Sequence, residues 1–178
     1  PAYDEAERLE GVLVGVAEAG VELDVVVIDD GSGDATAAVA RQAGAHVVRH
    51  PFNLGYGAAL QTGYKYGLEA GASFLVQMDA DGQHDPKDIA RLVAPIVRDE
   101  ADLVVGSRFL ESTGYRHGAL RTLGRLLFRG LVRLAGLRVS DPTSGFQVMN
   151  RRVLEVYARD FFPMDYPDVD VLLAAHRR

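Results

Sequence analysis

Residues 74–86 read FLVQMDADGQHDP, and this stretch gives the clearest indication of the fold class. It opens with a mostly apolar run of strand length, and two carboxylates two positions apart follow. Because side chains alternate along an extended chain, Asp79 and Asp81 can face the same side where the strand ends. Open α/β sheets bind their ligands at the carboxyl ends of their strands. We therefore expect an α/β domain with a site at this edge.

A second apolar run ends in the same way. Residues 25–36 read VVVIDDGSGDAT, so Asp29 and Asp30 also follow a predicted strand. A carboxylate in that position can accept a hydrogen bond from a base N–H or a ribose hydroxyl. Ser32 and Asp34 are interpreted as caps of the next helix. Neither the P-loop pattern nor the Gly-x-Gly-x-x-Gly pattern is present, which argues against those two nucleotide-binding modes.

Strand and helix patterns alternate along most of the chain, which is typical of an α/β domain with a mostly parallel central sheet flanked by helices. Strands are expected over residues 24–28, 45–49, 73–78 and 102–106. Helices are expected over residues 4–19, 33–43, 56–70, 86–98, 119–135 and 168–176. We expect residues 1–178 to form a single domain. The turn-like start and the last helix without a stop signal predict truncation at both ends.

Composition narrows the class of protein further. The chain has 178 residues, 48% of them apolar, and no cysteine, which excludes a disulfide framework and a thiolate zinc site. It shows neither a signal peptide nor an apolar run of the roughly 18 residues that a membrane span needs. The cytoplasm is therefore the expected compartment.

Charge is distributed unevenly. Seven arginines and one glutamate between residues 106 and 140 give a local charge of +6 on a chain of net charge −6. This pattern predicts a local anionic partner and argues against nucleic-acid binding. Arg121, Arg125, Arg129 and Arg133 recur every four residues, so they form a stripe along one helix face. With leucines on other faces, such a helix suits a membrane interface or an anionic lipid head group, and a solvated face is the competing interpretation.

The pair Asp79 and Asp81, with Gln83 or His84 nearby, suits Mg²⁺ or Mn²⁺. These hard cations keep some waters and take further ligands from a substrate diphosphate. An ordinary Asp-Gly turn is the competing interpretation. His50 and the other remaining histidines lack metal-ligand spacing and are interpreted as surface or packing residues. The segment 53–57 contains glycine but predicts no more than the start of a helix.

Six short motifs then occur in order along the chain. They are Pro1-Ala2-Tyr3-Asp4-Glu5, Asp29-Asp30-Gly31-Ser32, Asn53-Leu54-Gly55, Asp79-Ala80-Asp81-Gly82-Gln83-His84, Gly106-Ser107-Arg108-Phe109 and Asp141-Pro142-Thr143-Ser144-Gly145-Phe146. Together they resemble family 2 glycosyltransferases of the dolichyl-phosphate or polyprenyl-phosphate sugar synthase type. The resemblance implies a nucleotide-diphospho-sugar transferase fold of the GT-A type. It also implies inverting, metal-dependent transfer from a GDP- or UDP-sugar to a polyprenyl phosphate.

The resemblance also implies roles for individual residues. Asp81 and Arg108 would be catalytic, and Arg108 would contact phosphate or sugar near the reacting centre. The nucleotide sugar would bind Ala2, Tyr3, Glu5, Asp29, Asp30, Asp79 and Arg108. The metal would bind Asp79, Asp81 and Gln83, and the acceptor phosphate would bind Arg121 and Arg125. Such an enzyme would lie peripherally on the cytoplasmic face of a membrane, and self-association is compatible with it. Asp4 stands where many members have Asn.

Three alternatives stay open. The acceptor could be a saccharide hydroxyl in cell-wall or polysaccharide synthesis, which needs a general base such as Asp141, Asp168 or Asp170. A sugar-phosphate nucleotidyltransferase shares this architecture, but it usually has a Gly-rich, basic loop near the N-terminus that this chain lacks. The chain could also be a catalytically silent nucleotide-sugar-binding module.

Overall fold

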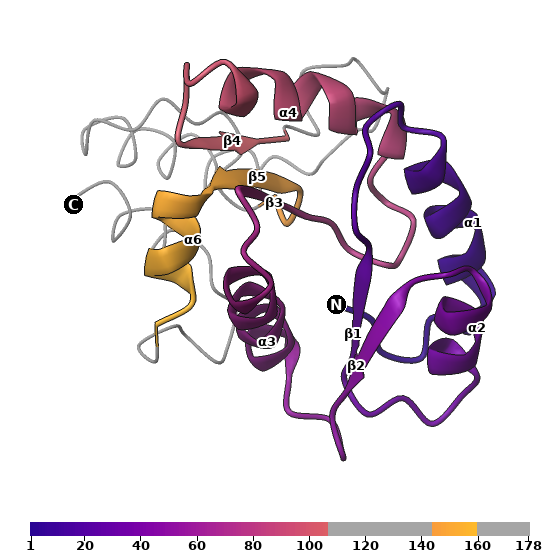
Figure 1. Ribbon diagram of the computed structural model, residues 1–178. Helices are drawn as coiled ribbons and strands as arrows, with labels where there is room; N and C mark the ends of the chain where they lie inside the picture. The colour runs from indigo at the N-terminus through magenta and orange to yellow at the C-terminus, as the bar shows by residue number, and fades with distance from the viewer. Residues whose placement is uncertain (107–143, 160–178) are drawn as a thin grey trace, which may run out of the picture.

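The computed structural model describes residues 1–106 and 144–159 (Figure 1). The elements in this part of the chain, in order, are α1 (Ala6–Ala17), β1 (Val26–Asp29), α2 (Thr36–Gln42), β2 (His46–Arg49), α3 (Tyr56–Glu69), β3 (Phe74–Gln77), the 3₁₀ helix η1 (Pro86–Asp88), α4 (Ile89–Val97), β4 (Leu103–Val105), β5 (Gln147–Asn150) and α6 (Arg151–Tyr157).

The strands form two hydrogen-bonded groups. β1 and β2 pair in parallel, with Val26 opposite His46. In the second group β5 lies between β3 and β4 and runs antiparallel to both, so β3 and β4 share one direction. A cavity of about 360 Å³ lies between β1 and β3 and is lined largely by apolar side chains, including Leu9 of α1 and Leu60 of α3. The expected α/β class is confirmed, with β5 as the antiparallel strand.

All four predicted strands are present, each shorter than expected or shifted by one or two residues at its ends. The four predicted helices within residues 1–106 are also present, and the last of them begins as η1 before it becomes α4. The sequence patterns did not predict β5 or α6. The helices predicted over residues 119–135 and 168–176 lie outside the described residues.

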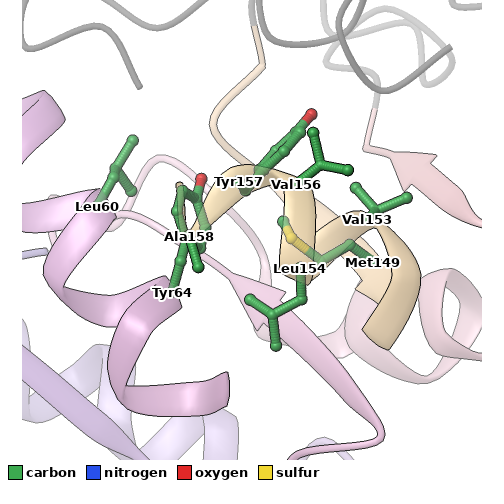
Figure 2. Close-up of a cluster of buried hydrophobic side chains, with 8 residues drawn as sticks. All are labelled: Leu60, Tyr64, Met149, Val153, Leu154, Val156, Tyr157 and Ala158. Carbon is green, nitrogen blue, oxygen red and sulfur yellow. The ribbon is translucent and has the colours of Figure 1, made fainter. Parts of the chain in front are cut away.

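Helices cover both faces of the three-stranded group. The consecutive residues Val148 and Met149 of β5 are both fully buried, and they point to opposite faces because side chains alternate along a strand. Val148 packs in a cluster with the apolar side of α4. Met149 packs in a cluster with α3 and α6, in which the rings of Tyr157 and Tyr64 meet edge to face (Figure 2).

The third cluster packs α1 and α2 against β1, and Figure 1 shows these two helices side by side. Ala40 of α2 and Leu9 of α1 pack in one cluster with Val27 of β1. This packing fixes the position of β1 and therefore of the segment that follows it. Within the described residues, no helix combines the length and the apolar character that crossing a membrane requires.

Candidate functional site

A cavity of about 350 Å³ lies where the chain leaves β1 and β3. Its walls come from four segments that are distant in sequence: the N-terminal residues, the turn after β1, the start of α3 and the turn after β3. The lining residues are Pro1, Ala2, Tyr3, Glu5, Asp30, Asn53, Tyr56, Ala59, Asp79, Ala80 and Asp81. The cavity therefore forms at the strand ends, where α/β sheets bind ligands.

The N-terminal wall is held in place by the end of β1. Ala2 donates its N–H to the Ile28 carbonyl and accepts from the Asp30 N–H, both at 2.9 Å. Asp4 has a φ of 53°, a left-handed conformation that Asn and Asp tolerate better than most residues. This backbone explains why Asp can stand here in place of Asn. Because Ala2 is fixed to the strand, Tyr3 and Glu5 are presented to the cavity.

Hydrogen bonds join residues 4–6 to the turn after β1. The Ser32 hydroxyl accepts from the Asp4 N–H at 3.0 Å, so Ser32 bridges two turns. The sequence suggested that Ser32 caps α2, and the structure shows that it does not. Asp34 accepts from the N–H of Thr36 at 2.8 Å and from the N–H of Ala6 at 3.1 Å. The Thr36 hydroxyl also donates to Asp34, and this bond, with further backbone donors, lowers the pKa of Asp34.

The two acidic residues after β1 have different environments. Asp29 is fully buried, accepts from the Ser32 N–H at 3.0 Å and forms an ion pair with Arg49 at 3.0 Å. It does not line the cavity. Asp30, 3% exposed, does line it, and its carboxylate also accepts from the N–H groups of Leu54 and Gly55 at 2.9 and 2.8 Å. Geometry therefore favours Asp30 over Asp29 as the ligand-facing carboxylate.

The opposite wall carries the acidic pair after β3. Asp79 is one-quarter exposed and accepts a hydrogen bond from the Tyr56 hydroxyl at 2.9 Å. Asp81 lines the same cavity and accepts from the Gln83 N–H at 2.9 Å, which closes the turn. The Gln83 side chain is exposed and is not part of the cavity wall. Asp79 and Asp81 thus face the cavity together from the turn that follows β3.

Strand topology brings a distant segment to Asp79. Gln147, the first residue of β5, lies opposite Gln77, the last residue of β3. Because the two strands are antiparallel, Gly145 before β5 approaches Asp79 after β3. A Cβ atom at Gly145 would lie 2.5 Å from Asp79 Oδ2 and 2.9 Å from the Tyr56 hydroxyl. Only glycine fits at this position without moving the carboxylate.

The charge of the cavity wall suits a divalent cation. The wall holds the carboxylates of Glu5, Asp30, Asp79 and Asp81, and no Lys or Arg side chain is among its described residues. Glu5 is paired with Arg8 at 2.8 Å, a contact that raises the Arg8 pKa. An anionic diphosphate would be repelled here unless a cation joined it to the carboxylates.

Asp79 and Asp81 supply oxygen donors of the kind that Mg²⁺ and Mn²⁺ prefer. In residues 1–106 and 144–159, no group of three or more His, Cys, Asp or Glu side chains could hold a metal ion. With two carboxylates as ligands, the remaining positions of such a cation would be filled by water and substrate phosphate. The residues present therefore fit such a metal.

The cavity brings together six of the residues singled out from the sequence: Ala2, Tyr3, Glu5, Asp30, Asp79 and Asp81. Asp29 and Gln83 lie outside its wall. Arg108, Arg121 and Arg125 lie outside the described residues, as do Asp141, Asp168 and Asp170. Asn53 and Tyr56 were not predicted as site residues. Asn53 belongs to one of the six motifs, Asn53-Leu54-Gly55, but this motif was given no role at the site. The motif and its position directly before a helical pattern were the available signals.

The comparisons with known proteins agree with this geometry. Residues 1–158 match the family model described as glycosyl transferase family 2. The chain belongs to glycosyl transferase family 2. This family assignment confirms the resemblance drawn from the six sequence motifs.

Two relatives illustrate the range of this family. The polyprenol monophosphomannose synthase of Mycolicibacterium smegmatis is 35% identical over 166 residues, which is 87% of this chain and 61% of that protein. The UDP-N-acetylglucosamine--dolichyl-phosphate N-acetylglucosaminyltransferase of Methanococcus voltae is 30% identical over 175 residues, 88% of this chain and 69% of that protein. The chain therefore spans less than two thirds of the length of the mycobacterial synthase.

Solved structures of a similar enzyme share the fold. The glucosyl-3-phosphoglycerate synthase of Mycobacterium tuberculosis, in complex with Mn²⁺, UDP-glucose and phosphoglyceric acid, superposes with a TM-score of 0.67 at 27% identity. The match covers 88% of this chain and 56% of that one. The expected GT-A type fold is thus confirmed for this family 2 glycosyltransferase domain.

Proposed function

We propose that this family 2 domain transfers a sugar, with inversion, from a nucleotide-diphospho-sugar to a polyprenyl phosphate. One observation carries the proposal: Asp79 and Asp81 share a cavity with Asp30, Ala2 and Tyr3. One wall therefore offers metal-binding carboxylates, and the other offers a carboxylate and an aromatic ring for a nucleoside. A nucleotide diphosphate needs both, because its two ends differ in charge.

In this proposal Asp30 accepts a hydrogen bond from the base or ribose, and Tyr3 and Ala2 form the rest of that wall. Asp79 and Asp81 hold the cation, Mg²⁺ or Mn²⁺, which would stabilise the charge that develops on the leaving diphosphate. Gln83 stays a predicted third ligand on the strength of its turn with Asp81. Arg108 stays a predicted contact of phosphate or sugar.

The reaction would form one bond and break one. A phosphate oxygen of the acceptor attacks the anomeric carbon while the bond from that carbon to the diphosphate oxygen breaks, and the nucleoside diphosphate leaves. A lipid monophosphate has a second pKa of about 6 and is largely dianionic at neutral pH, so it needs no general base. Arg121 and Arg125 are proposed to hold this phosphate close to the donor.

Two observations favour the lipid acceptor. The relatives named above act, by their names, on polyprenol and dolichyl phosphate. The charge of +6 between residues 106 and 140 also suits an anionic head group at a membrane surface. Because this acceptor lies in a membrane, we also propose that the enzyme lies peripherally on the membrane's cytoplasmic face.

A hydroxyl acceptor is the second candidate. The structure with phosphoglyceric acid shows that a solved neighbour binds a phosphorylated small molecule in place of a lipid. Transfer to a hydroxyl needs a base to take its proton, and Asp141, Asp168 and Asp170 stay the predicted candidates.

The first test is calorimetric titration with UDP, GDP, UDP-glucose and GDP-mannose, each with Mn²⁺ and with EDTA. We expect at least one ligand to bind with Mn²⁺ and to lose most of its affinity with EDTA. Asp81→Asn should reproduce the loss. Asp85→Asn is the matched control, because Asp85 is exposed in the same segment, lies outside the cavity, and Asn retains its cap on η1.

The ligand that binds then serves as donor in a transfer assay. The acceptors are undecaprenyl phosphate in detergent, 3-phosphoglycerate and a free saccharide. Transfer to undecaprenyl phosphate alone would support the proposal, and transfer only to a hydroxyl would replace it with the second candidate. Metal-independent binding that Asp81→Asn leaves unchanged would contradict the metal site.

A further inference from the structure

His50, directly after β2, is a buried polar residue that the proposed chemistry does not use. It is 8% exposed, and both ring nitrogens have partners. Nδ1 lies 2.6 Å from Asp30 Oδ1, and Nε2 lies 2.9 Å from the Thr62 hydroxyl on α3. His50 therefore connects α3 to the carboxylate of Asp30, which lines the cavity.

The direction of these hydrogen bonds follows from their partners. An ionised carboxylate can only accept, so His50 Nδ1 donates to Asp30. On the other side of the ring, Nε2 lies beside the Thr62 hydroxyl, which also lies 2.9 Å from the Ala58 carbonyl. His50 Nδ1 thus supplies the buried carboxylate of Asp30 with a side-chain hydrogen-bond donor. This hydrogen bond offsets part of the cost of burying the carboxylate next to an acidic cavity.

The same carboxylate organises the next segment of the wall. Asp30 Oδ1 accepts from His50 and from the Leu54 N–H, and Oδ2 accepts from the Gly55 N–H. A carboxylate has about four acceptor positions, so one position on Oδ2 is left for a ligand in the cavity. The backbones also meet here, because a Cβ atom at Gly31 would lie 2.5 Å from the Phe52 carbonyl carbon. Residues 30–31 and 52–55 thus form one unit.

We propose that His50 is a positioning residue of the nucleotide site: it holds Asp30 so that a single acceptor position faces the cavity. The inference rests on the proposed function, since the ligand of that position is a nucleoside N–H or hydroxyl. His50 itself does not touch the ligand. Its removal leaves Asp30 free to rotate and loosens the Leu54 and Gly55 N–H bonds that shape the wall beside Asn53.

Two substitutions separate the two ring nitrogens. In His50→Asn the amide nitrogen takes approximately the place of Nδ1 and keeps the donor to Asp30. In His50→Gln the amide reaches toward Thr62 and the donor to Asp30 is lost. His46→Gln is the control, since His46 is exposed at the start of β2, the strand that precedes His50. We expect His50→Gln to weaken nucleotide binding in the presence of Mn²⁺ about tenfold or more, and His50→Asn to stay within about threefold of the parent.

A second readout requires no ligand. Amide hydrogen exchange followed by NMR should show faster exchange at Leu54 and Gly55 in His50→Gln than in His50→Asn, relative to amides in α4. A residue that only fills space would change both variants alike, in step with their melting temperatures. If the parent binds nucleotide and His50→Gln binds equally well, the inference is wrong and the proposed function stands. If the parent binds none of the nucleotides, both are overturned.

Discussion

The Tyr56 hydroxyl orients the carboxylate of Asp79, which we propose as a metal ligand. The phenol O–H donates to Asp79 Oδ1 at 2.9 Å, while Gly145 leaves room for Oδ2. Hydrogen bonds to a ligating carboxylate fix its orientation, and their loss typically lowers metal affinity tenfold or more. The orientation of Asp79 therefore depends on the first residue of α3 and on the turn before β5.

Replacement of Tyr56 by Phe should lower Mn²⁺ affinity about tenfold while the fold is kept. The ring still fills its place in the wall, but Asp79 loses its donor. The measurement is titration of Mn²⁺ into the free protein, followed by electron paramagnetic resonance. Tyr66→Phe is the matched control on the same helix, because Tyr66 lines the other cavity. Equal Mn²⁺ affinity in the parent and in Tyr56→Phe would refute this role.

Sequence alone located the acidic residues of the site but not the contacts among them. Asp79 and Asp81 could be located because both follow an apolar run of strand length, although they lie in the turn after β3 and not on the strand itself. The choice between Asp29 and Asp30 could not be made, since it depends on which carboxylate Arg49 engages and which one faces residues 50–55. His50 is separated from Asp30 by twenty residues, and no local pattern reports such a contact.

At the scale of elements, local patterns predicted the strands and helices that bury an amphipathic or fully apolar segment. β1 and β3 were found because each is an apolar run that ends in acidic turn residues. β5 was missed because only two of its four residues, Val148 and Met149, are apolar, which is too short a run to indicate a strand. Its place between β3 and β4 depends on pairing with residues more than forty positions earlier. The sequence does contain a signal for the start of α6, because Asn150 is a residue type that often caps helices. In the structure the Asn150 side chain accepts from the Val153 N–H at 3.1 Å and caps the helix.

The turn before α2 should make stability depend on pH through Asp34. Hydrogen bonds from Thr36 and Ala6 lower the folded-state pKa of this carboxyl. A group whose pKa falls on folding stabilises the protein fully above its unfolded pKa, about 3.9 for Asp, and this contribution is lost as pH falls through the folded value. Asp34 therefore stabilises the fold at neutral pH and ceases to do so in acid.

The variant Asp34→Asn should accordingly be less stable than the parent at pH 7, and the difference should shrink below about pH 4. Urea denaturation at pH 7, 5 and 3 measures it. Glu10→Gln removes an exposed carboxylate from α1 and controls for net charge. A difference between Asp34→Asn and the parent that is the same at all three pH values would contradict the role of the ionised carboxylate.

At the scale of the whole molecule, the return of the chain through β5 joins the fold to the site. β5 pairs with both β3 and β4, places Gly145 against Asp79, and continues directly into α6. α6 then packs on α3, the helix whose first residue contacts Asp79. α3 and α6 are separated by about ninety positions in the sequence, and one cluster of buried side chains holds them together (Figure 2).

That cluster should account for a large share of the stability of the described part. Leu154 of α6 is fully buried within it, so Leu154→Ala removes apolar contacts and leaves a cavity. Substitutions of this kind cost about 2 to 5 kcal/mol. Val97→Ala at the end of α4 is the control, because Val97 is 67% exposed and should change stability little. Urea denaturation at pH 7 compares the free energies of unfolding. A loss below about 1 kcal/mol for Leu154→Ala would mean that the packing of α6 on α3 contributes little to stability.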